Sequence, residues 1–202
     1  CVMLASANDG CNVVAEYVSG SVEAFVEKMN ERALEIGCTD THFANPHGLH
    51  EDDHYTTARD LARIAMVALE NDDFYTICTT TSYTVPATNL SDARTLYTTN
   101  YLTSDAMTPA YYWPTARGVK TGYTSQAGRC LITTATGNGL SLLSVVCGAA
   151  TVVQENGDLK LENFTESRRL LEFGLNNFDY ATVLSNLDTI DQITVNFSAG
   201  AD

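Results

Sequence analysis

The stretch Arg117–Ala135 reads Arg-Gly-Val-Lys-Thr-Gly-Tyr-Thr-Ser-Gln-Ala-Gly-Arg-Cys-Leu-Ile-Thr-Thr-Ala, and the fold we expect follows from it. Its first half alternates β-branched and aromatic residues with Lys120 and Gly122, which predicts a strand. Lys120 is expected on the face opposite the β-branched side chains, and a turn and a second strand come next. Gly122 has no side chain, so a ligand backbone can approach the strand closely there.

The residue types of Lys120 and Thr121 suit carboxylate binding. An ammonium group and a hydroxyl beside a strand edge can hold a carboxylate, while the strand backbone pairs with an extended peptide. The plain alternative is an edge strand with a solvated lysine, and a Lys-Thr-Gly triplet is too short to decide between the two. Other motifs in the chain are needed to distinguish carboxylate binding from a solvated lysine.

Composition limits the classes of function. The chain has 202 residues, of which 45% are hydrophobic, enough to build a core, and 18% are charged. Its net charge of −14 and isoelectric point of about 4.4 argue against nucleic acid and anionic membrane surfaces as partners. No stretch approaches the roughly 20 apolar residues that a membrane-spanning helix needs.

Six cysteines are spread widely and form no C-x-x-C pair, so they match neither a zinc ribbon nor a dense disulfide scaffold. Cys130 and Cys147 stand in apolar strand contexts, which predicts buried free thiols. A chain that begins Cys1-Val-Met, without an initiator methionine, is interpreted as part of a longer protein.

Four helices are expected. Cys11–Val18 has a helical pattern, with Ser6 and Asn8 on the loop that feeds it; as an alternative to a functional role, Ser6, Asn8 or Asp9 caps this helix. Ser21–Ile36 carries one apolar stripe expected in the core. The other two begin with capping-box patterns, at Thr57–Asp60 and at Asn163 with Glu166. The position of Asp60 in the first turn of its helix gives it a structural role, and no catalytic role is needed to explain it.

The loop 38–56 contains all four histidines of the chain, which raises a metal hypothesis: His42, His47, His50 and His54. No pair has the helical spacing with a general-base glutamate that marks a metalloprotease, and nothing fixes three convergent ligands. Pro46 and Gly48 predict an ordered turn in which His47 is a hydrogen-bonding strut.

The second half of the chain is rich in β signals. Arg129–Thr136 and Leu140–Gly148 are separated by Gly-Asn-Gly, a strong hairpin signal. Thr81–Pro86 predicts a short strand, and Leu96–Leu102 reads as a polar and aromatic connection. Ile190–Phe197 predicts the first strand of another unit.

Several of these pieces together resemble the serine D-alanyl-D-alanine carboxypeptidases of peptidase family S11, the low-molecular-mass penicillin-binding proteins. Ser6-Ala7-Asn8 looks like their S-x-N element, and Lys120-Thr121-Gly122 looks like their K-T-G strand. The segments Thr41–Leu49 and Tyr55–Asp60 are similar to the family's stretch between these motifs. The resemblance covers about residues 1–180 in the family's order, which is far more specific than a triplet.

The resemblance implies an α/β (α+β) fold shared with class A β-lactamases. An antiparallel sheet would carry K-T-G on an edge strand, and a helical lobe would present S-x-N across a cleft. Residues 1–180 would form the C-terminal portion of the catalytic domain. Residues 181–202 would be a linker and the start of a β-rich C-terminal domain.

One departure concerns the reactive pair. Family enzymes use S-x-x-K, and no serine of this chain is followed by lysine three residues later. In the family this motif precedes S-x-N, so the nucleophile helix and its strands are expected before Cys1. We expect residues 1–202 alone to be inactive, and to aggregate or to need the missing segment, because half of the core would be exposed.

The resemblance implies catalytic roles for Ser6, Asn8 and Lys120. Ser6 would relay a proton to the leaving amine. Asn8 would bind the acyl-side amide and steady the catalytic lysine of the missing motif. Lys120, together with Thr121, would hold the terminal carboxylate of the substrate.

Substrate binding is implied for Thr121, Gly122 and Tyr123, the last through its backbone N–H in the oxyanion hole. His47 and Asp60 are not expected to touch the substrate; at most they belong to the layer of residues that surrounds the catalytic ones. The partners would be peptidoglycan stem peptides ending in D-Ala-D-Ala and β-lactams, with no cofactor, no metal and no nucleic acid. The protein would act outside the cytoplasmic membrane, with membrane attachment only through segments outside this chain.

Three alternatives stay open. A degenerate homologue would grip stem peptides or β-lactams without turnover. A class A-like β-lactamase needs a deacylating glutamate between S-x-N and K-T-G, and neither Glu51 nor Glu70 stands in a matching context. A metal hydrolase using the histidine-rich loop is the third.

Overall fold

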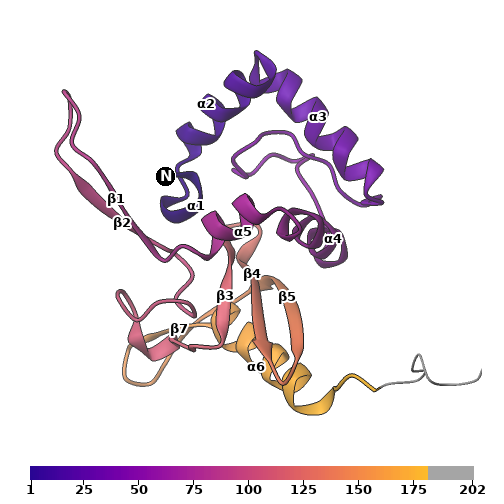
Figure 1. Cartoon of the computed structure of the whole chain (residues 1–202), viewed down its shortest axis with the longest axis vertical. Helices are drawn as coiled ribbons and strands as arrows, with labels where there is room; N and C mark the ends of the chain where they lie inside the picture. Colours follow the sequence, from indigo (N-terminus) through magenta and orange to yellow (C-terminus); the bar gives the residue numbers. More distant parts are fainter. Residues whose placement is uncertain (182–202) are drawn as a thin grey trace, which may run out of the picture.

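A three-stranded antiparallel sheet forms the centre of the computed structural model, which describes residues 1–181. The strands are β3 (Ala116–Thr124), β4 (Gly128–Gly137) and β5 (Leu140–Ala149), in that order, so β3 lies at one edge (Figure 1). The strand predicted at Ile190–Phe197 and the predicted linker from residue 182 onward lie outside the described residues.

The two tight connections follow from local residue preferences. The β4–β5 hairpin turns at Asn138 and Gly139, both left-handed with φ of 53° and 78°, as a two-residue hairpin turn requires. Gly128, with φ of 68°, begins β4, and a Cβ there would meet the backbone of Gly148 at 3.1 Å. The predicted strands and hairpin are confirmed.

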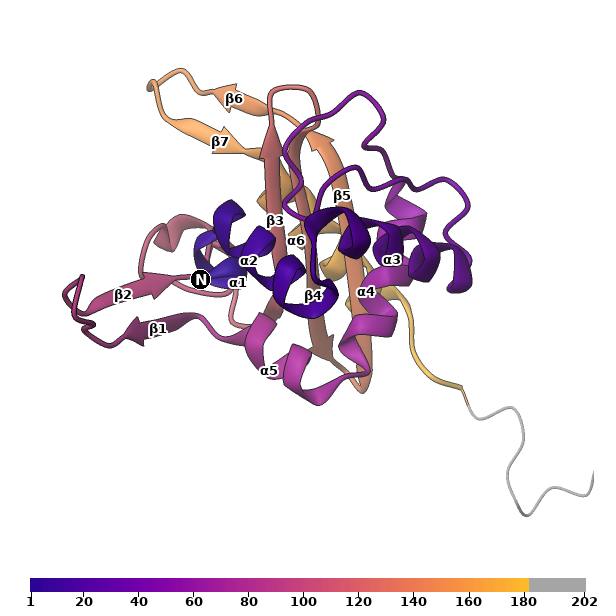
Figure 2. The same cartoon turned by 90° about the horizontal axis from the view of Figure 1, so that it is seen from above.

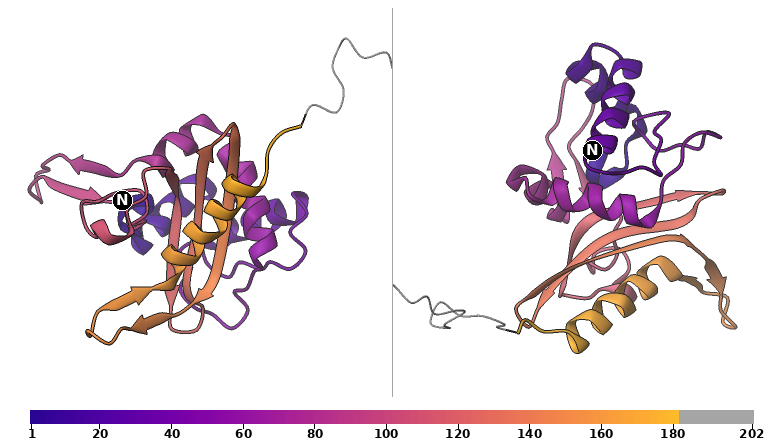
Figure 3. Two further views of the ribbon diagram at one scale, coloured as in Figure 1. Left: turned by 90° about the horizontal axis from the view of Figure 1, so that it is seen from below. Right: turned by 90° about the vertical axis from the view of Figure 1, so that its right-hand side faces the viewer.

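Helix α6 (Glu162–Asn177) covers one face of the sheet (Figure 3). Leu171 and Leu175 pack against Ala135 of β4 and Leu140 of β5. Gly174 allows the close approach, because a Cβ at that position would lie 2.5 Å from Leu142. The predicted fourth helix is therefore confirmed, and its apolar surface belongs to the core.

The helical lobe lies on the other side of the sheet (Figures 2 and 3). It consists of α1 (Val2–Ala5), α2 (Asn8–Ser19), α3 (Val22–Glu35), α4 (Ala58–Leu69) and α5 (Asp72–Thr79). Of these helices, α4 contacts β5 and α5 contacts β3. The hydroxyl groups of Ser21 and Thr57 cap α3 and α4, as the sequence predicts. None of the helices within residues 1–181 is long and apolar enough to cross a membrane.

The predicted start of α2 is wrong in detail. Asn8 is the first residue of the helix, and the capping position is Ala7, whose side chain makes no cap hydrogen bond. Ser6 instead ends α1 in the left-handed conformation, with φ of 52°. Neither Ser6 nor Asn8 serves as a cap, which leaves both side chains available for another role.

The apolar stripe of α3 is only partly buried, contrary to the prediction that it belongs to the core. Ala33 is buried, while Phe25, Met29 and Ile36 keep intermediate exposure. Together with Phe43 and other residues they line a groove of about 320 Å³. The periodicity identified the apolar face correctly, but periodicity does not report how completely a face is covered.

Several short elements were not predicted. They are α5, the strand β2 (Arg94–Tyr97), and the pair β6 (Thr151–Val153) and β7 (Leu159–Leu161). The predicted strand at Thr81–Pro86 is confirmed as β1 (Ser82–Val85), which pairs with β2. α5, β2, β6 and β7 are short and mostly exposed, so they carry little hydrophobic periodicity.

Trp113 joins the two parts of the core, because it packs against both buried clusters that α6 forms with the sheet. Tyr111 packs against the first of these clusters, and its hydroxyl accepts a hydrogen bond from the backbone N–H of Leu161 at 2.7 Å. Tyr111 and Trp113, which precede β3, thus serve to pack the core.

Asp60 ties α4 to the loop that follows α3. Its buried carboxylate accepts hydrogen bonds from the backbone N–H of Asp40 and the hydroxyl of Thr41, both at 2.9 Å, and pairs with Arg63 at 3.1 Å. Burial raises the pKa of Asp60, but these three partners outweigh burial and hold it below its ordinary value. The structural role predicted for Asp60 is confirmed.

We expect Asp60 to make stability depend on pH. Because its folded-state pKa is depressed, its contribution is present above the unfolded pKa of about 4 and is lost as pH falls through the folded value. Asp60→Asn should lower the melting temperature at pH 7, and its difference from wild type should shrink below pH 4. Asp40→Asn, at an exposed carboxylate, is the control in thermal melts across pH. A difference that stays constant down to pH 2 contradicts this prediction.

Candidate active site

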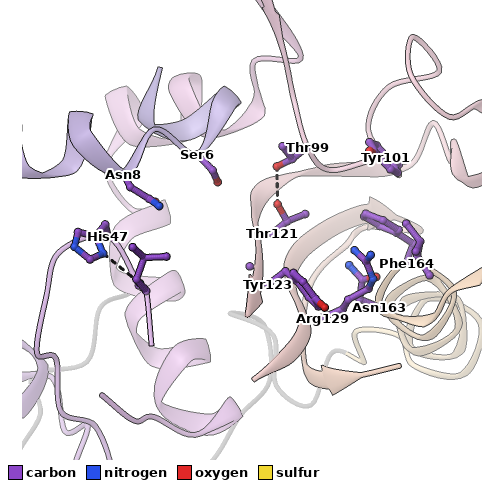
Figure 4. A pocket seen from close by; sticks show the side chains of 14 residues that line it. Ser6, Asn8, His47, Thr99, Tyr101, Thr121, Tyr123, Arg129, Asn163 and Phe164 are labelled. Atoms are coloured by element: carbon purple, nitrogen blue, oxygen red, sulfur yellow. Dashed lines mark hydrogen bonds between the residues drawn. The ribbon is translucent and has the colours of Figure 1, made fainter. Parts of the chain in front are cut away.

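A cavity of about 600 Å³ opens between the helical lobe and the edge strand β3 (Figure 4). Its walls come from segments far apart in the sequence: Ser6, Asn8, His47, Gly48, Leu49, Thr99, Tyr101, Thr121, Gly122, Tyr123, Arg129, Leu161, Asn163 and Phe164. Most of the residues singled out in the sequence therefore meet in one place.

Ser6 and Lys120 connect the two sides of the cavity. The Lys120 ammonium group donates a hydrogen bond to the Ser6 hydroxyl, although the two residues are 114 positions apart, and another to the Thr121 carbonyl at 2.8 Å. Burial lowers the pKa of Lys120 below its ordinary value, while the nearby Cys11 thiol acts in the opposite direction. The left-handed backbone of Ser6 places its hydroxyl at the gap between α1 and α2.

The histidine-rich loop forms another wall. Buried Asn45 folds it by accepting hydrogen bonds from the backbone N–H groups of His47 and Gly48, at 3.3 and 2.7 Å. The His47 ring accepts one from the N–H of Leu49 at 3.2 Å, as expected of a strut. However, His47 lines the cavity directly. It therefore lies closer to the cavity than the sequence prediction, which placed it at most in the layer of residues around the catalytic ones.

The exposed end of β3 supplies the remaining predicted residues. The Thr121 and Thr99 hydroxyl groups are hydrogen-bonded at 2.5 Å, and Gly122 exposes its backbone to the cavity. The Tyr123 side chain is 64% exposed. A strand edge with an accessible backbone, a hydroxyl and an ammonium group can bind an extended peptide that ends in a carboxylate.

Asn100 fixes the position of this strand. It is 2% exposed, and its side-chain N–H donates to the Gly118 carbonyl at 2.5 Å and to the Thr133 hydroxyl at 3.3 Å. Its side-chain oxygen accepts from the N–H of Leu102. These bonds satisfy a carbonyl within the irregularity that interrupts β3–β4 pairing between Arg117 and Lys120.

Sequence reasoning missed several residues of the cavity. Thr99 and Tyr101 line it while Asn100 and Leu102 are buried, an alternation that was present within Leu96–Leu102. Asn163 was assigned as the cap of the last helix, and this is wrong: Leu161 holds the capping position, and no side chain caps α6.

Other predicted candidates lie elsewhere. Asp60 is not among the residues that line this cavity. Within residues 1–181, no three His, Cys, Asp or Glu side chains come together in a way that could hold a metal ion, so the histidines of the loop do not converge.

Cys130 pairs with Gly122 across β3 and β4 and is not among the residues that line the cavity. Contrary to the prediction of two buried thiols, Cys147 is exposed and Cys130 is partly exposed, although both are free. Interaction with the Cys147 thiol lowers the pKa of Cys130 to about 6, and the same interaction raises the pKa of Cys147. Cys130 is therefore the nucleophilic member of the pair.

The chain belongs to the D-alanyl-D-alanine carboxypeptidase family, whose sequence profile matches residues 1–151. This is a bacterial family of serine-type, penicillin-binding hydrolases connected with peptidoglycan. Among its curated relatives, D-alanyl-D-alanine carboxypeptidase DacF of Bacillus subtilis is 32% identical over 194 residues, which are 96% of this chain and 46% of the relative. DacC of Escherichia coli is 31% identical, covering 98% and 47%. The chain thus spans about half the length of these relatives.

Solved structures confirm the fold class. The Streptomyces K15 DD-transpeptidase matches with a TM-score of 0.73 at 27% identity, over 87% of this chain and 65% of that one. A D-alanyl-D-alanine carboxypeptidase from Mycobacterium tuberculosis H37Rv matches with a TM-score of 0.69 at 28% identity, over 87% and 62%. The mixed architecture of helices and antiparallel sheet is that of the DD-peptidases.

We expect Asn100→Ala to destabilise the protein by about 1–3 kcal/mol, because the substitution leaves the Leu102 N–H buried without a partner and removes one of the two donors to the Gly118 carbonyl. Urea unfolding of the full protein measures the change. Asn156→Ala, at an exposed turn between β6 and β7, should change stability by less than about 0.5 kcal/mol and is the control. Equal effects of the two substitutions would contradict the role assigned to Asn100.

We expect iodoacetamide to alkylate Cys130 with a rate midpoint near pH 6, since only the thiolate reacts. Cys147→Ala removes the interacting thiol, so the pKa of Cys130 and the alkylation midpoint should rise. Peptide mapping by mass spectrometry across pH measures both midpoints. A midpoint that does not move in the variant would show that Cys147 has no such effect.

Proposed function

We propose that this chain forms the substrate-binding and proton-relay side of a serine-type D-Ala-D-Ala carboxypeptidase that trims peptidoglycan stem peptides. The hydrogen bond from Lys120 to Ser6 carries the proposal, because it joins the K-T-G strand to the S-x-N element across one cavity. Family membership and the presence of Asn8, Thr121 and Tyr123 in the same cavity walls support it.

The substrate is held by its end and by its backbone. Lys120 and Thr121 bind the terminal carboxylate, because a cation and a hydroxyl are strong partners for it. The peptide extends along the edge of β3, where Gly122 leaves room for its backbone. Asn8 hydrogen-bonds the amide on the acyl side. The Tyr123 N–H donates to the carbonyl oxygen on which negative charge develops.

The reaction proceeds through an ester. A serine supplied by a segment outside residues 1–202 attacks the carbonyl of the penultimate residue, forming a serine ester as the peptide bond breaks. The Ser6 hydroxyl passes a proton to the departing amine of the terminal D-alanine. Water then hydrolyses the ester and restores the serine. β-Lactams acylate the same serine through the carbonyl of their ring amide.

This activity places the protein in the cell envelope, on the outer side of the cytoplasmic membrane, where its substrate occurs. A non-catalytic homologue that only binds stem peptides or β-lactams is the second candidate, and it would lack S-x-x-K in the full protein. Acylation distinguishes the two candidates, since only the enzyme forms a covalent adduct.

We expect the full protein that contains residues 1–202 to gain the mass of one benzylpenicillin, attached to a serine preceding Cys1. Lys120→Gln should slow this acylation by about 100-fold or more, because one charged donor to the reacting ligand is lost. Intact mass spectrometry over time measures the rate.

Lys28→Gln removes an equal charge from α3, outside the cavity, and should acylate at the wild-type rate. A full protein that takes no adduct would contradict the enzyme and favour the binding homologue. A Lys120→Gln variant that reacts as fast as wild type would contradict the assignment of Lys120.

A further inference from the structure

Two free cysteines, Cys130 on β4 and Cys147 on β5, have no part in the function proposed above. Neither of them lines the cavity, so their chemistry is separate from substrate binding. Cys147 is exposed and Cys130 is partly exposed. Soluble reagents can therefore reach both thiols, which a buried structural cysteine does not allow.

The register of β4 and β5 brings the two residues opposite each other. Pairing is regular as far as Leu131 and Val146, and then it shifts by one residue. Cys130 therefore stands opposite Cys147 and Gly148, which is a β-bulge, and Gly148 has the left-handed φ of 68° that such a bulge accommodates. Opposed residues of an antiparallel pair have Cα atoms about 4.5–5.5 Å apart. This separation falls within the roughly 4.4–6.8 Å between the Cα atoms of a disulfide.

Both thiols project from the same face of the sheet. Leu131 on β4 and Leu142 on β5 pack in the clusters that α6 forms with the sheet. Successive side chains of a strand point to opposite faces. Cys130 is one position from Leu131, and Cys147 is five positions from Leu142, so both cysteines point away from α6. Their sulfur atoms can therefore meet without a change of strand register.

The interaction between the two thiols gives them different reactivities. It lowers the pKa of Cys130 to about 6 and raises the pKa of Cys147. At neutral pH Cys130 is therefore mainly a thiolate, the form that attacks a disulfide. A reactive, accessible thiolate with a second thiol beside it is the usual arrangement of a site of reversible oxidation.

We propose that Cys130 and Cys147 form a site of reversible oxidation, at which a low-molecular-mass disulfide converts the two thiols into a covalent link between β4 and β5. The Cys130 thiolate attacks one sulfur of the small disulfide, whose S–S bond breaks and releases a thiolate. Cys147 gives up its proton, and its sulfur attacks the Cys130 sulfur of this mixed disulfide and releases the second thiolate. The protein loses two electrons and two protons, and the small disulfide is reduced to two thiols.

The link lies beside the K-T-G strand. Cys130 pairs with Gly122 of β3, and a Cβ at Gly122 would lie 3.7 Å from the Cys130 Cβ. The new bond closes a loop that contains the β4–β5 hairpin, which restricts the unfolded chain. We therefore expect oxidation to stabilise the sheet that carries Gly122.

Oxidised and reduced glutathione test the site in the full protein. After oxidised glutathione and alkylation of the remaining thiols, peptide mapping by mass spectrometry should find Cys130 and Cys147 joined in one peptide pair, lighter by two hydrogen atoms. Neither residue should then carry the alkyl group. Reduced glutathione should restore alkylation of both. Thermal melts should show the oxidised protein melting several degrees above the reduced one.

Cys147→Ala removes the second thiol, so the reaction should stop at a glutathione adduct on Cys130. Cys1→Ala is the matched control, because it removes another exposed thiol, at the start of α1, and should form the Cys130–Cys147 link as wild type does.

A wild-type protein in which Cys130 keeps its glutathione adduct, or in which both thiols stay reduced, would overturn the proposal. Equal melting temperatures of the linked and reduced forms would contradict the stabilisation of the sheet. These measurements need neither substrate nor penicillin, so their outcome is independent of the proposed function.

Discussion

The buried side chain of Asn100 holds the edge strand in the position on which the cavity depends. β3 pairs irregularly with β4 just before Lys120, and a carbonyl within such an irregularity loses its partner in the sheet. Asn100 and Thr133 both donate to that carbonyl, at Gly118. A buried carbonyl without a donor would cost about 1–3 kcal/mol, so the amide stabilises a backbone shape that regular pairing does not allow. The end of β3 can then approach the helical lobe.

The cavity lies between two parts of the fold, the sheet with α6 and the helical lobe. The sheet and α6 bury apolar side chains against each other, and the helical lobe meets the opposite face through α4 and α5. Ser6 and Lys120 meet where these parts face one another, with an acceptor hydroxyl on the helical side and a donor ammonium group on the strand side. Small rotations between the two parts would separate this pair, which makes the contact sensitive to how the lobes pack.

Local patterns were enough for the regular elements. Alternation in Arg117–Ala135 and the Asn138-Gly139 turn predicted the sheet, and apolar periodicity predicted α3, α4 and α6. The motif residues Ser6, Asn8 and Thr121 were also found, because the order of short motifs along a chain is specific. α5 and the strands β2, β6 and β7 were missed, since short and mostly exposed segments carry no clear hydrophobic period. Their positions depend on contacts with distant parts of the chain.

The sequence by itself determined the fold class, the family resemblance and the set of motif residues, because these follow from local periodicity, turn chemistry and the order of motifs. Only the tertiary structure decided that Arg129 and Asn163 lie at the same cavity as Thr121, that His47 stands in its wall and that Asp60 does not. It also decided that Asn163 is an unpartnered wall residue and not a helix cap. The physical reason is that helix and strand patterns depend on neighbours a few positions away. A cavity depends on which distant side chains remain uncovered after the core has packed.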